Sequence, residues 1–81
     1  MTKEQVEAKL LDLLEEICDD DAVRQERDID LFEAGLLDSM GAIDLLVSIE
    51  EAFDVIIAPT EVEREEMNST NKIIERVVER L

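Results

Sequence analysis

Apolar residues near the N-terminus recur at steps of three and four, which is the spacing of one face of an α-helix. The positions in this stripe are Val6, Leu10, Leu13, Leu14 and Ile17. Thr2 and Gln5 precede it at the spacing of a capping box. The aspartates at 19–21 favour a turn and oppose the macrodipole at a helix C-terminus. The pattern therefore predicts a first helix that begins after Thr2 and ends close to these aspartates.

The stretch from Asp19 to Gly35 lacks sustained helical spacing, and we expect a long connection there. Three of its residues, Ile29, Leu31 and Phe32, are too apolar for a solvated linker. Some of them are therefore predicted to plug the core, so that the connection follows a defined path.

Helical spacing returns after Gly35 in the most apolar part of the chain. The apolar positions there are Ala42, Ile43, Leu46, Val47, Ile49 and Phe53. Asp38 or Ser39 would be the N-cap of this second helix. The residues 55–57 have strand propensity, but no other run offers a partner and Pro59 ends the stretch. We expect residues 55–57 to form a buried connector.

The C-terminal part of the chain contains the patterns of two further helices. Thr60 and Glu63 are spaced as a capping box, which predicts a short third helix over residues 59–67 with Val62 and Met67 facing inward. A last helix would be capped by one of the three polar residues 68–70 (Asn68, Ser69 or Thr70). Its apolar face comprises Ile73, Ile74, Val77, Val78 and Leu81.

The elements together predict an all-α fold, a small four-helix bundle of three longer helices and one short third helix with a long first loop. The 81 residues are expected to form a single domain over 1–81 and a monomer, and so small a core leaves no room for a deep active-site cavity. Phe32 and Phe53 are the only aromatic residues, so the core must consist mostly of Leu, Ile and Val.

The net charge of the chain limits the classes of macromolecule that it can bind. The chain has 23 acidic and 8 basic residues and a formal net charge of −15, so nucleic acid and anionic lipid surfaces would repel it. The same field favours proteins with a basic docking surface. The N-terminal stretch is amphipathic and acidic, unlike a signal peptide or a membrane span, so we expect a cytoplasmic protein without membrane insertion.

Metal sites are not indicated. The single Cys18 and the absence of histidine leave no disulfide and no zinc ligand set, and Cys18 fits a small residue near the end of the first apolar face. Asp28 and Asp30 match the start of an EF-hand loop, but Phe32 and Glu33 break that signature.

Ser39 follows Asp38 at the predicted start of the second helix. An autonomous enzyme is not expected, because Leu37 replaces the first glycine of a nucleophile elbow and no histidine can take the serine proton. A simple reading is that Ser39 caps the helix. The alternative is an exposed hydroxyl presented to another protein, because Asp38 can cap and a helix N-terminus suits an attached phosphate. Leu36, Leu37 and Met40 would then form an apolar contact patch around it.

These residues resemble a known motif. The stretch DLFEAGLLDSMGAIDLL, Asp30 to Leu46, is similar to the prosthetic-group attachment motif of acyl and peptidyl carrier proteins, and the whole chain is similar to that fold in length, acidity, helix order and long first loop. Within this superfamily, LFEAGLLDSMG and the NKII at Asn71–Ile74 most resemble the D-alanyl carrier family of Gram-positive bacteria.

The resemblance implies a non-catalytic carrier. Ser39 would receive phosphopantetheine from coenzyme A through a phosphodiester, added by a separate phosphopantetheinyl transferase with magnesium, and the chain would thus be a phosphoprotein. The terminal thiol of the arm, not Cys18, would hold the cargo as a thioester. In the D-alanyl family a D-alanine-activating ligase loads the arm, and a membrane-bound acyltransferase system passes D-alanine toward lipoteichoic or wall teichoic acid in the cell wall.

The surroundings of Ser39 are the expected docking face, with Asp38 and Asp44 as charged contacts and Leu37 and Met40 as apolar ones. The alternative that Leu37 and Met40 pack inward stays open. Gly41 favours the D-alanyl family, whereas Asp44 is closer to general acyl carriers. An acyl or aminoacyl carrier for fatty-acid, polyketide or peptide synthesis therefore remains the second interpretation, and an unmodified acidic helical adaptor the third.

Overall fold

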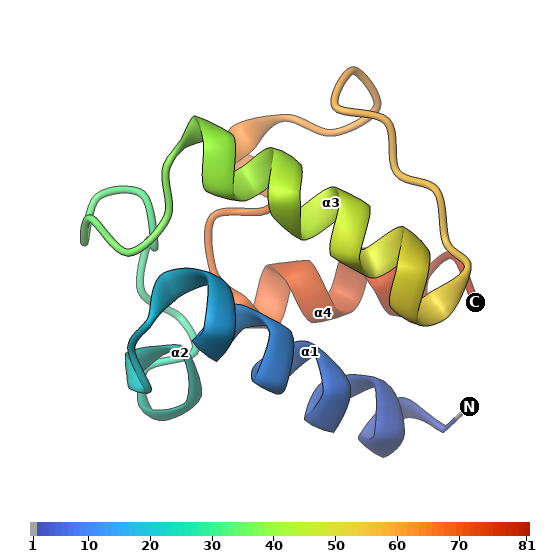
Figure 1. The fold of residues 1–81 in the computed structure, drawn as a ribbon, viewed down its shortest axis with the longest axis horizontal. Coiled ribbons are helices and arrows are strands. Elements are labelled where there is room, and N and C mark those ends of the chain that lie inside the picture. The colour runs from blue at the N-terminus through green and yellow to red at the C-terminus, as the bar shows by residue number, and fades with distance from the viewer. Residues whose placement is uncertain (1) are drawn as a thin grey trace.

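A computed structural model describes residues 2–81, and Figure 1 shows the path of the chain. The elements are α1 (Lys3–Cys18), α2 (Ala22–Gln25), α3 (Ser39–Phe53), the 3-10 helix η1 (Arg64–Glu66) and α4 (Thr70–Val78). Residues 2–81 contain no β-strand. The predicted all-α bundle with a long first loop is confirmed, with α1, α3 and α4 as its three longer helices.

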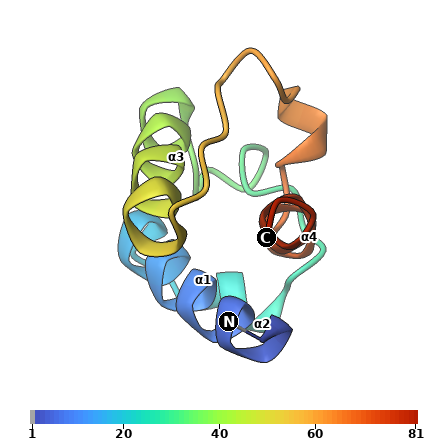
Figure 2. The same cartoon turned by 90° about the vertical axis from the view of Figure 1, so that its right-hand side faces the viewer.

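The core lies where α1 contacts both α3 and α4 (Figure 2). It is built from Leu, Ile and Val side chains, as the scarcity of aromatic residues predicts. The apolar side chains with no more than 1% of their surface exposed are Val6, Leu10, Leu14, Val23, Leu31, Leu45, Ile49, Ile73 and Val77. Each of the three longer helices therefore contributes one apolar face to a shared interior.

The predicted first helix is confirmed. The Thr2 hydroxyl accepts from the Gln5 amide at 3.2 Å, and the Gln5 side chain accepts from the Thr2 amide at 2.9 Å, which completes the capping box. The helix ends at Cys18, and Asp19 follows in the left-handed conformation with φ 53°. Aspartate tolerates this conformation better than most residues, which explains the stop at this position.

The long connection contains a short helix, α2, that the sequence pattern did not predict. Four residues are too few to show a helical period, and tertiary contacts stabilise the turn. Val23 is fully buried, and the Arg24 guanidinium pairs with Asp12 and Glu15 of α1. The expected core plug is present: Leu31 is fully buried, and Phe32 packs against the core at its edge.

The inward face of α3 was only partly predicted. Ile49 and Phe53 are buried, but Ile43 and Val47 are 54% and 49% exposed, and Leu45 is buried. Several sides of this helix are apolar, so spacing alone did not identify the side that packs on α1.

The connector after α3 was also only partly predicted, because Ile56 is 69% exposed between the buried Val55 and Ile57. The predicted third helix over 59–67 is wrong in length: only the 3-10 turn η1 forms there. Its capping box joins Glu63 and Glu66 rather than Thr60 and Glu63. Like charges crowd this segment and only two apolar residues support it, so a longer helix gains little.

The last helix begins after Ser69, whose hydroxyl accepts from the Lys72 amide at 3.3 Å. Ile73, Ile74 and Val77 are buried as predicted, but Leu81 lies beyond the end of the helix and is 58% exposed. The expectation that Leu81 belongs to the helical face is therefore wrong, because α4 ends at Val78.

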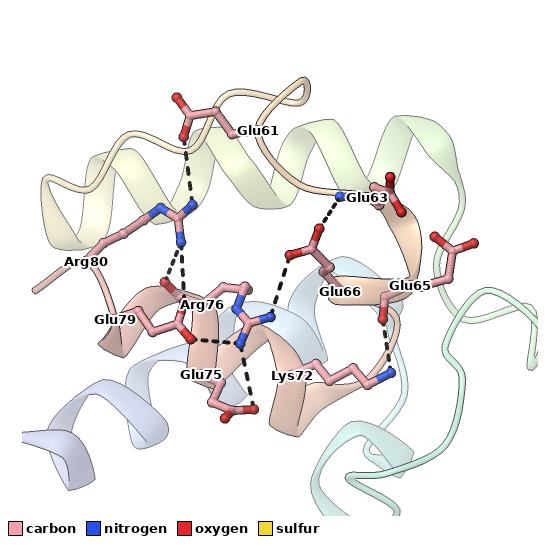
Figure 3. Close-up of polar contacts among 9 residues, drawn as sticks. All are labelled: Glu61, Glu63, Glu65, Glu66, Lys72, Glu75, Arg76, Glu79 and Arg80. Atoms are coloured by element: carbon pink, nitrogen blue, oxygen red, sulfur yellow. Dashed lines mark hydrogen bonds and ion pairs between the residues drawn. The ribbon is translucent and has the colours of Figure 1, made fainter.

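Ion pairs join the segment 61–66 to α4 and to the residues that follow it (Figure 3). Arg80 lies 3.8 Å from the Glu61 carboxylate, and Arg76 lies 3.8 Å from that of Glu66. The Lys72 ammonium donates to the Glu65 carbonyl at 3.0 Å. Individual pairs of this exposure contribute little, but together they fix the position of a segment that has few apolar anchors.

Candidate functional site

Ser39 is the first residue of α3, and its side chain is exposed. The N-cap is Asp38, whose carboxylate accepts from the Gly41 amide at 2.6 Å while its carbonyl accepts from the Ala42 amide at 2.8 Å. Within residues 2–81 the Ser39 hydroxyl makes no hydrogen bond. Of the two predicted caps, Asp38 therefore performs the capping, and the serine projects beside it.

The turn before α3 is fixed by backbone contacts. Gly35 adopts φ 76°, which an L side chain would strain. The Leu36 and Leu37 amides both donate to the Leu31 carbonyl, at 2.9 and 3.1 Å. A β-carbon on Gly41 would lie 3.1 Å from both the Asp38 carboxylate and the Leu37 side chain. The chain therefore approaches the helix start closely, and Ser39 has a defined position.

An open apolar groove of about 280 Å³ lies beside Ser39. Ser39 forms part of its wall, and most of the remaining wall is apolar and comes from α3, from the long connection and from the segment 59–67. Apolar residues that line it include Phe32, Ile43, Leu46, Pro59, Val62 and Met67. A chain attached to the Ser39 hydroxyl would therefore start at the wall of this groove.

The predicted docking residues do not all share one surface. Asp38, Met40 and Asp44 are exposed on the first turns of α3, and Met40 is 77% exposed. Leu37 is only 4% exposed and packs inward, so the inward alternative is correct for Leu37 and wrong for Met40. Met40 and the exposed Ile43 and Val47 instead form an apolar stripe along α3, because they recur at helical spacing.

The site presents a hydroxyl but does not activate it. The chain has no histidine, and the Asp38 carboxylate is engaged by the Gly41 amide. A serine oxygen is a weak nucleophile without an adjacent base.

Cys18 is half-buried at the end of α1, as expected. Burial raises the pKa of its thiol, and the charge of Asp20 raises this pKa further. Both effects disfavour the reactive thiolate.

The acidic residues considered for calcium have structural partners. The Asp28 carboxylate accepts from the Asn71 side chain at 2.7 Å, and that of Asp30 accepts from the Phe32 amide at 2.9 Å. Within residues 2–81, no group of three or more His, Cys, Asp or Glu side chains is placed to hold a metal ion. None of the helices in this range has the length and apolar character needed to cross a membrane.

Arg64 is a further residue of the groove that sequence reasoning did not single out. Its guanidinium carbon lies 4.0 Å from the centroid of the Phe32 ring. The signal that could have identified it is a lone arginine within an acidic run, EVEREE at 61–66.

The geometry fits the phosphate-linked arm implied by the resemblance. An exposed hydroxyl stands at the N-terminus of a 15-residue helix, where backbone N–H groups and the helix dipole favour an anion. The apolar groove beside it can receive a flexible chain. No side chain of the site has to move for the hydroxyl to be reached, because it is already exposed.

Comparison with known proteins gives the same family. The family model of the phosphopantetheine attachment site matches residues 8–77. The D-alanyl carrier protein of Bacillus velezensis is 45% identical over 71 residues, which cover 88% of this chain and 91% of that protein. That of Lactococcus lactis subsp. cremoris is 47% identical over 72 residues, or 89% of this chain and 91% of the relative. That of Bacillus cereus is 39% identical over 77 residues, or 95% and 92%. The chain therefore belongs to the phosphopantetheine attachment family of carrier proteins, and its cofactor is a covalently attached phosphopantetheine.

Proposed function

We propose that this chain carries D-alanine as a thioester on a phosphopantetheine arm joined to Ser39. The observation behind the attachment point is the exposed Ser39 hydroxyl beside a separate cap, Asp38. The cargo is supported by relatives named D-alanyl carrier protein, which are 39–47% identical over most of the chain. Residues 1–81 would act as one carrier domain in the cytoplasm.

Attachment needs chemistry that the chain lacks. The Ser39 oxygen forms a bond to a phosphorus of coenzyme A, and the pyrophosphate bond breaks to release the nucleotide. The serine proton passes to a base on a phosphopantetheinyl transferase, since Asp38 is committed to the cap and no histidine is present. The bound arm supplies a terminal thiol for the acyl group. The chain itself orients the attachment point through α3 and the turn before it.

The partners would be that transferase, a D-alanine-activating ligase and a membrane-bound acyltransferase system that passes D-alanine toward lipoteichoic or wall teichoic acid. Asp38 and Asp44 would provide charged contacts to basic surfaces, and Met40 an apolar contact at the centre. Leu37 is buried, so it would not contact a partner directly but would support the turn before α3. Selection of the amino acid would rest with the ligase, since the groove beside Ser39 is open rather than enclosed.

A second candidate is a carrier for other acyl groups. The apolar groove beside Ser39 favours it, because a short hydrocarbon chain would lose contact with water there. D-alanine is small and carries a charged amine, so it gains little from such a groove. The two functions therefore differ in which loading enzyme accepts the holo-protein.

The test begins with mass spectrometry after treatment with a broad-range transferase and coenzyme A. Wild type and Ser48→Ala, a control at another serine of α3, should gain the mass of one arm, whereas Ser39→Ala should gain none and stay folded. Labelled D-alanine, ATP, magnesium and a D-alanine ligase should then give a thioester that hydroxylamine cleaves. Modification of Ser39→Ala would refute the attachment point. Charging by a fatty-acyl enzyme but not by the D-alanine ligase would favour the second candidate.

A further inference from the structure

Arg64 differs from the other arginines in its charge environment. Arg24, Arg27, Arg76 and Arg80 each lie within 4.0 Å of at least one carboxylate, but within residues 2–81 no such ion pair involves Arg64. The neighbouring acids are engaged elsewhere: Glu66 pairs with Arg76 of α4, and Glu61 pairs with Arg80 just after α4 (Figure 3). The lysines of residues 2–81 also lack such a pair, so Arg64 is set apart from the other arginines and not from every basic residue.

Phe32 holds the Arg64 guanidinium in place. The 4.0 Å distance from the guanidinium carbon to the ring centroid is that of a cation–π contact. The Phe32 backbone is itself anchored, since its amide donates to the Asp30 carboxylate at 2.9 Å. Stacking uses the face of the guanidinium and leaves its N–H groups free to donate at the edge. The arginine is therefore pre-oriented for an anion that accepts two hydrogen bonds.

Arg64 and Ser39 line the same groove. Four acidic residues line the groove or the neighbouring hollow with Arg64, yet within residues 2–81 no carboxylate lies within 4.0 Å of its nitrogens; they are Glu63 in the groove and Asp30, Glu33 and Glu65 in the hollow. A phosphodiester on Ser39 would place a negative charge in the groove, and guanidinium groups bind phosphate oxygens in a forked geometry. Charge complementarity and continuity with the attachment point thus identify the arm as the occupant of this groove.

We propose that Arg64 binds the phosphodiester of the arm on Ser39 and thereby turns the arm into the apolar groove. This inference rests on the proposed attachment at Ser39. Loss of the contact would free the arm from the groove without preventing its attachment. Arg64 is therefore a positioning residue for the resting arm. Met40 and Val47 of the exposed stripe on α3 do not line the groove and stay available to partners.

NMR spectroscopy of apo- and holo-protein tests this positioning directly. In wild type, attachment of the arm should shift two sets of signals: the amides of Met40 and Gly41 beside the attachment point, and those of Phe32 and Val62 together with the Arg64 Nε–H in the groove. In Arg64→Gln the groove shifts at Phe32 and Val62 should fall at least threefold, while the shifts beside Ser39 persist. Arg64→Lys keeps the charge but not the fork and should be intermediate. Lys3→Gln removes an equal charge from the start of α1 and should match wild type.

The outcomes separate the two proposals. Intact mass reports attachment independently of where the arm lies, so an unmodified wild type would refute the proposed function itself. Equal modification of wild type and Arg64→Gln, with groove shifts that are the same in both or absent from both, would overturn the role of Arg64 and leave the carrier function intact. Comparison of each holo-variant with its own apo-form removes any direct effect of the substitution on Phe32. Loss of the groove shifts only in Arg64→Gln, and partly in Arg64→Lys, would establish the contact.

Discussion

Asp38 and Ser39 are adjacent and have different roles: Asp38 caps α3, and Ser39 presents a free hydroxyl. The Asp38 carboxylate satisfies the Gly41 amide, and the Ser39 hydroxyl remains exposed. A serine that capped its own helix would have its oxygen engaged by a backbone N–H and turned toward the helix. The pair therefore combines a stable helix start with an accessible nucleophile.

Replacement of Asp38 tests this division. Asp38→Ala should lower the free energy of unfolding by about 1 kcal/mol, because the Gly41 amide loses its partner, whereas Asp38→Asn should cost only a few tenths since asparagine caps as well. Urea unfolding followed by circular dichroism measures both. Asp44→Ala, exposed on the same helix, serves as the control and should change stability by less than about 0.5 kcal/mol. An Asp38→Ala protein as stable as wild type would show that Ser39 can take over the cap.

Cys18 should be a slow nucleophile at neutral pH. Burial and the Asp20 charge raise the pKa of its thiol, so the thiolate forms only at higher pH than in a free cysteine. In the holo-protein, iodoacetamide should therefore alkylate the arm's thiol several-fold faster than Cys18, and the rate at Cys18 should rise with pH and in urea. Peptide mapping by mass spectrometry assigns the two sites. Preferential alkylation of Cys18 in the folded protein would contradict the pKa shift.

At the scale of elements, Asn68, just before α4, anchors the long connection through its side chain and its backbone. The Asn68 amide side chain donates to the Asp30 carboxylate at 3.1 Å, and the Leu31 amide donates to the Asn68 carbonyl at 2.7 Å. Leu31 in turn accepts from the two residues that lead into α3. The position of Ser39 thus depends on contacts between segments more than 30 residues apart.

A double-mutant cycle measures this anchor. Asn68→Ala and Asp30→Ala should show a coupling energy of roughly 1 kcal/mol, because their hydrogen bond is partly buried and involves a charge. The matched exposed pair, Asn71 and Asp28, should couple by less than about 0.5 kcal/mol. Hydrogen exchange should also show faster opening of the Leu31 amide in Asn68→Ala. Equal coupling in both pairs would mean that burial does not distinguish them.

At the scale of the whole molecule, negative charge dominates. The net charge of −15 produces a long-range field that attracts basic surfaces and weakens with salt. Asp38 and Asp44 place part of this charge beside Ser39, and the apolar stripe lies between and beyond them on α3. The acidic residues that attract a basic partner and the Met40 side chain that contacts it would thus lie on one surface.

Charge reversal at Asp44 should weaken recognition by the transferase. Asp44→Lys is expected to lower kcat/KM about tenfold at low salt, with a smaller difference from wild type at about 0.5 M salt because screening removes the charge effect. Glu26→Lys changes the net charge equally on an exposed residue after α2 and should have a much smaller effect. If both variants lose the same activity, net charge alone would explain the result and Asp44 would have no docking role.

Local pattern predicted the parts of this protein that depend on near neighbours along the chain. The extent of α1, its capping box and the start of α3 follow from spacing and capping chemistry, and hydrophobicity predicted a core plug among Ile29, Leu31 and Phe32. The motif around Ser39 resembles one known family, and the comparisons confirmed that family. These features are encoded by residues three or four positions apart, so sequence alone determined them.

Tertiary structure decided which of several compatible surfaces became buried. Ile43 and Leu45 are both apolar in sequence, but the assembled fold buries Leu45 and exposes Ile43. The same assembly buries Leu37 and exposes Met40, which changes the docking face. The groove that unites Ser39 with Arg64 joins segments 25 residues apart, and α2 forms because Val23 and Arg24 find partners on the folded core. Burial is a property of the assembled helices, and for that reason no local pattern could determine it.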